Sequence, residues 1–264
     1  MEQVLRLNKG NYSGTVQLLK EYAGFITSKT AYTDCQKEFH YHENPHLSFI
    51  LQGGNIEYKQ KETSIKNIGD ILFYHSGELH KTLPLNDKTC NFNLEIDASF
   101  LKENSLSEYE LYKSVARIEY SRLFMLKVYS DVQLNDTLTA VSIHSLLLGF
   151  IKNTSVGNYQ DIKWCQQLRE ILNDEWSENH SLAELSKRLT VHPVTISRYF
   201  TKYFGCTYGD YVRRLRISKS LPLIRLGNRS LTEIAIICGF ADQSHFIRVF
   251  KHYTGINPKH FQKL

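Results

Sequence analysis

One pattern occurs twice in the last third of this chain, at residues 181–205 and again at residues 230–255. Each copy begins with Ser-x-x-Glu and ends with Arg-x-Phe and a glycine, and the two arginines, Arg198 and Arg248, lie 50 positions apart. In Ser-x-x-Glu the serine side chain accepts from the third helical N–H while the glutamate reaches back, so each copy predicts a helix start. A repeat at a fixed offset predicts two similar structural units.

Each copy has the pattern of a short apolar helix, a turn and an amphipathic helix. Leu185 and Leu189 share one face of the first helix, and Gly239 supplies the positive φ that the second turn needs. Such a helix-turn-helix unit can place its second helix in the major groove of DNA. We expect these second helices at about residues 192–203 and 242–253.

Charge is divided unevenly along the chain. Residues 1–160 carry 16 Lys and Arg and 18 Asp and Glu, whereas residues 180–264 carry 14 and 4, a net charge of +10. The overall charge of +5 conceals this difference. A basic helical region favours nucleic acid as the partner, although a solvated basic surface would carry the same charge.

The five cysteines are widely spaced and form no Cys-x-x-Cys motif, which argues against a disulfide framework and a cysteine zinc site. The N-terminal residues lack the apolar segment of a secretory signal, and no apolar run is long enough to span a bilayer. We therefore expect a cytoplasmic protein with no membrane association.

Residues 1–100 are expected to form β-strands. Short apolar or alternating runs, at residues 47–51, 56–59, 71–74 and 92–96, are separated by turn-forming residues. Closely spaced strands with turn signals between them predict a sandwich or a barrel.

Five of the 11 histidines fall between positions 40 and 80. His40 and His42 lie on one face of a strand, because strand side chains alternate. The segments HYHENPHLSFILQGG and GDILFYHSGELH resemble the two motifs of the cupin barrel. His40, His42 and His80 match its metal-ligand positions, whereas His46 stands where metal-binding cupins have glutamate and His75 where they have proline. The resemblance implies a cupin-like β-barrel, and imidazole suits Zn, Fe, Ni or Cu.

Cupin barrels in regulators mostly bind small molecules without metal, so we favour a metal-free effector pocket. Apolar walls with a few polar groups are typical of such pockets. The candidate effector-binding residues are His40, His42, His46, Phe49, Phe73 and His80. We expect no cofactor; a metal, if one is bound, would take its ligands from His40, His42, His46 and His80.

Residues 105–152 have apolar side chains at helical spacing, including Leu134, Leu138 and Val141. A periodic stripe shows only that one face is buried. These helices therefore either cover the barrel or form a two-fold dimer contact.

The polar, glycine-containing segment after these helices predicts a domain boundary. We expect a sensor and dimerisation domain at residues 1–152, a linker at 153–163 and a DNA-binding domain at 164–264. In the helix that joins the two repeated units, Pro222 predicts a kink or a stop near Leu221, because an internal proline costs a helix about 3 kcal/mol.

Spaced positions throughout residues 164–264 match a known family. They are Leu185, Ile196, Ser197, Arg198, Phe200, Gly205, Tyr211, Arg216, Ile234, Ala235, Gly239, Phe240, Phe246, Arg248, Phe250, Lys251, Gly255, Pro258 and Phe261. This region resembles the AraC/XylS family of bacterial transcription regulators, and departs from it at Thr190, Ser220 and Pro222. The resemblance implies an α+β two-domain protein, with a cupin-like N-terminal β-barrel and helical segment followed by an all-α double helix-turn-helix.

The family uses exposed positions of the two second helices to contact DNA. Here they are Val194, Thr195, Ser197, Arg198, Lys202, Gln243, Ser244, Arg248, Lys251 and His252. Arginine can bond guanine, glutamine can pair with adenine, and valine or threonine can contact a thymine methyl. Lys202, Lys251 and His252 are expected to meet phosphate. For each position, an ordinary solvated side chain is the alternative.

Three functions are considered. We expect a transcriptional regulator, not an enzyme, that binds double-stranded promoter DNA as a homodimer and responds to a small-molecule effector, such as a sugar or other metabolite. The second is a metal-binding cupin, either a metal sensor or an enzyme, with an appended DNA-binding domain. An enzyme of this kind needs three or four metal ligands and a general acid or base. The third is a DNA-binding protein whose barrel only dimerises.

Overall fold

The computed structural model describes residues 4–33, 35, 37–59, 62–152 and 162–264. The chain forms two compact units, Met1–Leu148 and Gly149–Lys263. Most of the predicted linker, at 153–161, lies outside the described residues, so the domain limits stay a prediction. Among the described helices, none is long and apolar enough to cross a membrane.

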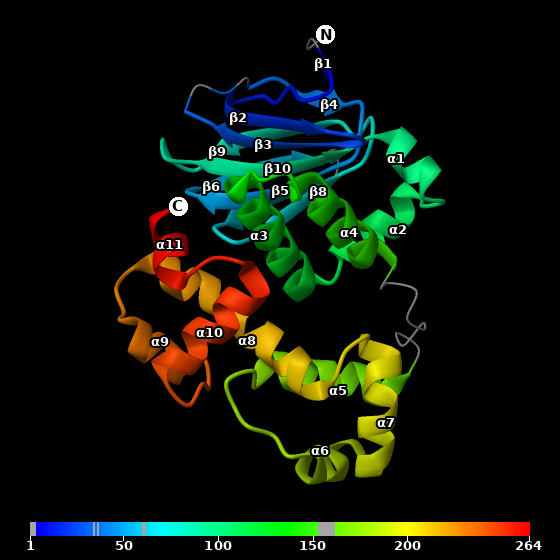
Figure 1. The fold of residues 1–264 in the computed structure, drawn as a ribbon, viewed down its shortest axis with the longest axis vertical. Helices are drawn as coiled ribbons and strands as arrows, with labels where there is room; N and C mark the ends of the chain where they lie inside the picture. Colours follow the sequence, from blue (N-terminus) through cyan, green and yellow to red (C-terminus); the bar gives the residue numbers. More distant parts are fainter. Residues whose placement is uncertain (1–3, 34, 36, 60–61, 153–161) are drawn as a thin grey trace. The chain divides into compact units, whose positions relative to one another are not determined.

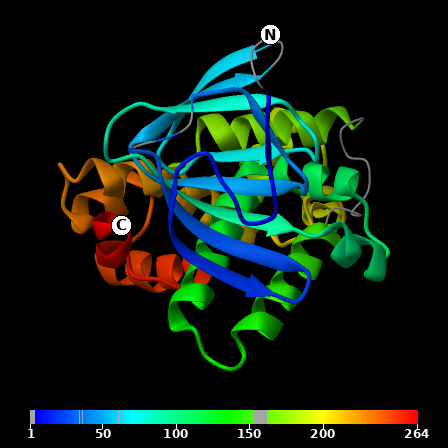
Figure 2. The same cartoon turned by 90° about the horizontal axis from the view of Figure 1, so that it is seen from above.

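The described strands of the N-terminal unit form two five-stranded sheets, which lie as two layers in Figure 1 and Figure 2. The first has the order β1-β4-β9-β6-β7, with bounds Leu5–Leu7, His40–His42, His80–Pro84, Gly54–Lys59 and Glu62–Asn67. The second has the order β2-β3-β10-β5-β8, with bounds Thr15–Tyr22, Phe25–Ala31, Cys90–Ile96, His46–Gln52 and Ile71–Tyr74. Strand β1 pairs with β4 in parallel.

The four predicted runs of strand are confirmed as β5, β6, β8 and β10. The predicted α+β two-domain class is also confirmed, because the N-terminal unit is rich in sheet and the C-terminal unit is helical. The cupin-like barrel consists of two facing sheets, and hydrogen bonds between the described strands do not close them into one cylinder.

Helices cover the outer face of the second sheet. They are α1 (Ala98–Glu103), α2 (Glu108–Val115), α3 (Ile118–Leu134) and α4 (Thr139–Lys152). In Figure 1, α3 and α4 lie against this sheet, and the ring of Phe92 on β10 meets the ring of Tyr129 on α3 at 5.1 Å. Aromatic and aliphatic side chains thus form the core between this sheet and the helices.

The apolar stripe predicted in this helical segment does not face the sheet. Leu134, Leu138 and Val141 are 69 %, 67 % and 66 % exposed, whereas Ile143 and Leu147 of α4 are fully buried. The predicted helical spacing of these three residues is interrupted, because α3 ends at Leu134, Leu138 lies in the turn before α4 and Val141 lies on α4. We call Leu134, Leu138 and Val141 the exposed stripe.

The C-terminal unit is all-helical over its described residues. Its helices are α5 (Lys163–Asp174), α6 (Leu182–Leu189), α7 (Pro193–Phe204), α8 (Tyr208–Leu226), α9 (Leu231–Ile237), α10 (Gln243–Thr254) and α11 (Pro258–Lys263). Both repeated units are present, as α6 with α7 and as α9 with α10, and α8 joins them. The predicted double helix-turn-helix is therefore confirmed.

Helix α8 continues through Pro222 to Leu226, so of the predicted kink or stop near Leu221 the stop is wrong and the kink stays a prediction. Leu221 and Ile224, on either side of the proline, are fully buried. Burying two such side chains contributes about 3–6 kcal/mol, which offsets the cost of about 3 kcal/mol for an internal proline. The Ser220 hydroxyl also donates to the Ile217 carbonyl at 2.7 Å.

Polar side chains line the inner face of the second sheet. Asn91 donates to Ser48 at 2.9 Å and Asn93 donates to Ser28 at 3.0 Å, whereas the alternate residue Phe92 faces α3. Among the described residues, the buried atoms between the sheets that lack a hydrogen-bond partner include Asn55 Nδ2 and Oδ1, Glu57 Oε1, Asn91 Oδ1, Asn93 Oδ1, His42 Nδ1 and His46 Nδ1. Buried polar groups are ordinarily bonded, so this interior suits a polar ligand.

Glu57 of β6 is only 1 % exposed. Its Oε2 accepts from the Tyr74 hydroxyl at 2.9 Å and from the Thr82 hydroxyl at 2.8 Å. Burial raises the pKa of the Glu57 carboxyl to about 7, although these hydrogen bonds and the Lys59 charge lower it. The folded protein therefore favours the neutral carboxyl.

The Glu57→Gln variant is expected to lose part of the pH dependence of stability. Because the pKa of Glu57 is raised from 4.5 to about 7 on folding, ionisation of this group destabilises the folded state as pH rises through that window. Between pH 4 and pH 8, the free energy of unfolding of the variant should rise by about 3 kcal/mol relative to that of wild type. Hydrogen exchange of peptides from β6 and β9 in urea measures this difference in unfolding free energy. The exposed Glu62→Gln change is the control, and parallel curves for Glu57→Gln and wild type would contradict the assignment.

Candidate nucleic-acid interface and effector site

The first helix-turn-helix unit consists of α6 and α7. Ser181 caps α6 by accepting from the Glu184 N–H at 3.1 Å. The predicted capping box is only half formed, because the Glu184 carboxylate lies 3.3 Å from His180 Nδ1 instead of bonding the Ser181 N–H. The helix ends at Thr190, which has a φ of 55°. This left-handed conformation is strained for a β-branched residue.

The second unit, α9 and α10, has the local structure that its sequence predicts. Ser230 and Glu233 form a complete capping box, with bonds of 3.2 and 2.7 Å. Gly239 takes a φ of 72° in the turn. Asp242 then caps α10 by accepting from the His245 N–H at 2.7 Å.

Helices α7 and α10, which we call the recognition helices, each bury one face and expose the other. Ile196, Phe200, Phe246 and Phe250 are fully buried. Most residues predicted to contact DNA lie on the exposed faces: Val194, Ser197, Arg198, Lys202, Ser244, Arg248, Lys251 and His252. Thr195 and Gln243 are half-buried, and the Gln243 side chain accepts from Thr232 at 2.6 Å.

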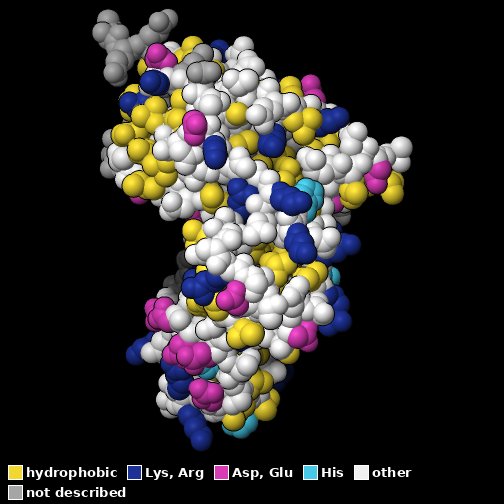
Figure 3. Space-filling model, turned by 90° about the vertical axis from the view of Figure 1, so that its left-hand side faces the viewer, with side chains coloured by type: hydrophobic (Ala, Val, Ile, Leu, Met, Phe, Trp, Pro, Cys, Tyr) yellow, Lys and Arg dark blue, Asp and Glu magenta, His cyan; other side chains and the backbone are white. Residues whose placement is uncertain are grey.

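The positive charges of the recognition helices are available to a ligand. Within the described residues, no ion pair engages Arg198, Lys202, Arg248 or Lys251. On the face shown in Figure 3, Lys and Arg side chains lie among Asp and Glu and do not form one continuous patch.

Four histidines meet between the two sheets. The side chains of His40, His42, His46 and His80 are at most 3 % exposed. The rings of His40 and His80 are 4.4 Å apart, and those of His42 and His46 are 4.2 Å apart. Burial lowers the pKa of His42 to about 3, with a further contribution from His40, and places the pKa of His46 and His80 well below its usual value. Burial lowers the pKa of His40 as well, so the interior favours the neutral form of all four rings.

Three of these rings fit a metal ion. One ring nitrogen from each of His40, His42 and His80 lies within 4.8 Å of the others. The Nδ1 of His40 lies 3.1 Å from the Glu38 carbonyl, and that of His80 lies 2.8 Å from the Glu78 carbonyl. An Nδ1–H bonded to a carbonyl leaves Nε2 as the metal-binding atom, an arrangement usual for metal ligands. His46 lies outside this group of three.

The two phenylalanines predicted for the effector site do not join the histidines. Phe49 lies three residues after His46 on β5, so the two side chains project from opposite faces of the strand. Phe73 lies opposite Leu47 in the β5–β8 register, on the same outer face, and its ring meets that of Tyr112 on α2 at 5.6 Å. The period of two places both phenylalanines on the face that the helices cover.

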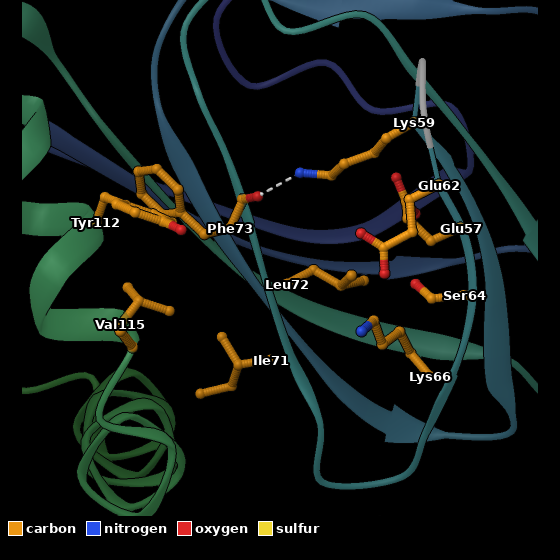
Figure 4. A pocket seen from close by; sticks show the side chains of 11 residues that line it. Glu57, Lys59, Glu62, Ser64, Lys66, Ile71, Leu72, Phe73, Tyr112 and Val115 are labelled. Atoms are coloured by element: carbon orange, nitrogen blue, oxygen red, sulfur yellow. Dashed lines mark hydrogen bonds between the residues drawn. The ribbon is translucent and has the colours of Figure 1, made fainter.

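A pocket of about 250 Å³ lies at the open edge of the two sheets, between the edge strands β7 and β8 and helix α2 (Figure 4). Its polar side includes Glu57, Lys59, Glu62, Ser64 and Lys66, and its apolar side includes Ile71, Leu72, Phe73, Tyr112 and Val115. Lys59 is fixed, because its Nζ donates to the Phe73 carbonyl at 2.9 Å and to Glu78 at 2.8 Å. Of the residues predicted for the effector site, Phe73 is the one that lines this pocket.

Glu57 connects this pocket to the histidines through Tyr74. The Tyr74 hydroxyl donates to Glu57, while its ring lies 4.0 Å from that of His80 and 4.6 Å from that of His46. Neither Glu57 nor Tyr112 is among the residues predicted for the effector site. The sequence signal for Glu57 is a charged residue in a strand at a position that faces inward, since acidic residues are seldom fully buried without a partner.

Comparison with known proteins places these features in a family. Residues 185–264 match a family described as a helix-turn-helix domain. The HTH-type transcriptional activator RhaR of Mannheimia succiniciproducens is 22 % identical over 270 residues, which cover 92 % of this chain and 96 % of that protein. The HTH-type transcriptional activator RhaS of Escherichia fergusonii is 32 % identical over 126 residues, covering 48 % of this chain and 42 % of that protein.

Among solved structures, ToxT from Vibrio cholerae is 16 % identical and covers 91 % of this chain and 98 % of its own, with a TM-score of 0.39. The match to the helix-turn-helix family falls on helices α6 to α11, which contain both repeated units. The similarity to RhaR extends over the sheet-rich unit as well. The chain is therefore a DNA-binding transcriptional regulator, and its helical unit is similar to the helix-turn-helix domain of the AraC/XylS family.

Proposed function

We propose that the chain recognises promoter DNA by placing α7 and α10 in successive major grooves. The observation that carries this proposal is the pair of exposed recognition-helix faces, whose arginines form no ion pair within the described chain. Successive major grooves on one side of DNA lie about 34 Å apart. One subunit then reads an asymmetric site, because its two helices differ in sequence.

The proposed roles follow from side-chain chemistry. Arg198 and Arg248 bond guanine, and Val194 contacts a thymine methyl. The remaining proposed contacts come from Thr195, Ser197, Lys202, Gln243, Ser244, Lys251 and His252, with the lysines and His252 at phosphates. Gln243 is oriented by Thr232, which prepares its amide for pairing with adenine.

We further propose that the pocket beside α2 binds the effector. Glu57 Oε1 is a buried polar atom at this pocket without a partner in the described chain, so the effector forms a hydrogen bond with it. The lining holds both lysine and glutamate side chains, which suits a neutral molecule. A volume of about 250 Å³ is small for a ligand pocket. These features favour a small, hydroxyl-rich metabolite such as a sugar, with Phe73 and Tyr112 against its apolar face.

A metal-responsive sensor is the second candidate function. The observation that favours it is the orientation of His40 and His80 by backbone carbonyls, with His42 beside them. Zinc, iron, nickel or copper would suit three imidazoles. We infer a sensor and not an enzyme, because the buried Glu57 carboxylate, which Tyr74 connects to the histidines, bonds Tyr74 and Thr82 instead of a histidine.

We propose that the protein acts as a homodimer in the cytoplasm, where promoter DNA lies. The exposed stripe supports this contact, because its three large apolar side chains, at the end of α3, in the turn before α4 and on α4, are at least 66 % exposed. A second copy of the same stripe gives an isologous two-fold interface. The effector pocket includes Tyr112 of α2, which belongs to the same helical segment.

The Arg248→Ala variant is expected to lose sequence-specific binding. Loss of a guanine contact should weaken binding to the preferred site by about 1–3 kcal/mol, with a smaller effect on random DNA. The preferred site is first selected from random duplexes with the wild-type protein, and affinities are then measured by fluorescence anisotropy. Arg229→Ala, an exposed arginine outside the recognition helices, is the control. An equal loss on both DNAs would assign Arg248 to phosphate.

A thermal-shift experiment with monosaccharides and polyols tests the effector pocket. A ligand that binds only the folded state at about 100 times its Kd should stabilise wild type by roughly 3 kcal/mol, and Tyr112→Ala should abolish the shift. Tyr109→Ala removes a second exposed tyrosine of α2 outside the pocket and should keep it. A shift with Zn²⁺ or Ni²⁺ that His80→Ala abolishes, with no response to polyols, would replace this proposal with the metal sensor.

The Leu138→Glu variant is expected to be monomeric at concentrations where wild type is a dimer. A charge in the centre of the exposed stripe would be buried without a partner in both copies. Sedimentation velocity measures the change. Ile65→Glu places the same charge on a residue of β7 that is 62 % exposed and should leave the dimer intact. A dimeric Leu138→Glu protein would rule out this interface.

A further inference from the structure

Arg216 of α8 occupies the centre of the helical unit. It is 7 % exposed, and burial lowers the pKa of its guanidinium. The guanidinium donates to the carbonyls of Trp176, Ser177, Glu178 and Gly239 and to Asn179 Oδ1, at distances from 2.7 to 3.3 Å. These hydrogen bonds satisfy a buried charge without a carboxylate partner, which explains how a charged residue is accommodated here.

These acceptors lie in the loop that leads into the first helix-turn-helix unit and in the turn of the second unit. The carbonyls at residues 176–178 and the Asn179 side chain lie in the loop between α5 and α6, just before Ser181 caps the first unit. Gly239 lies in the turn between α9 and α10 of the second unit. One side chain thus ties both units to the helix that joins them, and Figure 1 shows α8 running between them.

Gly239 provides the space for this contact. A Cβ at position 239 would lie 2.4 Å from the Ser177 carbonyl oxygen and 2.8 Å from the Arg216 guanidinium carbon. The backbone also has a φ of 72° there, which favours glycine. The turn of the first unit uses Thr190 in a similar conformation, so the positive φ alone does not explain the glycine. The glycine is explained by the close approach of the Ser177 carbonyl and the Arg216 guanidinium to this turn.

Further bonds hold both units to the first half of α8. The Tyr208 hydroxyl donates to the His180 carbonyl at 3.0 Å, in the loop before α6. The Tyr253 hydroxyl, at the end of α10, donates to Asp210 at 3.1 Å. Arg216 lies two turns further along the same helix and contacts both the loop that precedes the first unit and the turn of the second unit.

We propose that Arg216 is a positioning residue that sets the spacing and rotation between α7 and α10, and with them the number of base pairs between the two DNA segments that the protein reads. The inference rests on the proposed function of the two recognition helices. Without the guanidinium, each unit keeps its own core, because Phe200 and Phe250 are buried independently of it. Loss of the guanidinium therefore affects the spacing and rotation between the two units.

The test compares DNA duplexes that differ only in this spacing. The full-length wild type first selects its preferred site from a pool of random duplexes. One base pair is then inserted or removed between the two contacted segments. Wild type is expected to lose about tenfold or more in affinity with either change, similar to the cost of a mismatched base pair. Arg216→Met should bind the original and altered spacings within about threefold of each other, with Arg216→Lys in between.

Arg225→Met is the matched control. Arg225 is also a half-buried arginine of α8 that donates to backbone carbonyls, those of Phe261 and Gln262. Its partners lie only in α11, so this variant should keep the wild-type spacing preference even though it loses stability. Circular dichroism and thermal unfolding verify that each variant is folded. If Arg216→Met does not fold, Arg216→Lys alone decides, and it must show a weaker spacing preference than wild type.

The possible outcomes separate two failures. If wild type selects no preferred sequence, the proposed role of the recognition helices is wrong. If wild type has a spacing preference and the folded Arg216 variants keep it unchanged, the positioning role of Arg216 is wrong. A loss of spacing preference in Arg225→Met equal to that in Arg216→Met would assign the effect to general loss of stability and would also overturn the inference.

Discussion

A polar group that leaves water needs a hydrogen-bond partner, and the two units of this chain meet that requirement in opposite ways. In the helical unit, the Arg216 guanidinium finds five oxygen acceptors in the chain itself, and a fully bonded buried charge makes its surroundings rigid. In the sheet-rich unit, Asn55, Glu57 and Asn91 keep buried atoms without partners among the described residues. The first arrangement suits a fixed DNA-reading frame and the second suits a ligand site.

The two helix-turn-helix units are similar in sequence but unequal in local structure. The second has a complete capping box and a glycine in its turn. The first has half a capping box and holds Thr190 at a φ of 55°. A strained turn and an incomplete cap each lower the stability of a helix pair by about 1 kcal/mol or more. The second unit is thus the more stable helix pair, and contacts with α8 stabilise the first.

The organisation of the N-terminal unit links its proposed activities. Helix α2 lines the pocket with Tyr112 and Val115, while α3, α4 and the turn between them carry the exposed stripe. A ligand against α2 thus contacts the helical segment that we propose for dimerisation. Tyr74 extends the same network inward, since it bonds Glu57 and packs against His46 and His80. Ligand and histidines therefore share one set of polar contacts.

The sequence by itself determined the repeated helix pairs, four of the strands and the resemblance to a family. The spacing of Ile196 and Phe200, and of Phe246 and Phe250, predicted which faces are buried, because helical periodicity is a local property. The exposure of Arg198 and Arg248 followed from the same spacing.

Only the tertiary structure decided which of two possible faces meets a partner. The alternation along β5 separates Phe49 from His46, but the packing of the helices shows which face is the interior. Leu138 and Ile143 are both apolar residues of one helical segment, and only packing buries one and exposes the other. Pro222 stays within α8 because buried neighbours outweigh its local cost. Arg216 meets residues 37 to 40 positions earlier and 23 positions later, and contacts at such sequence separations depend on how helices pack, which local patterns do not specify.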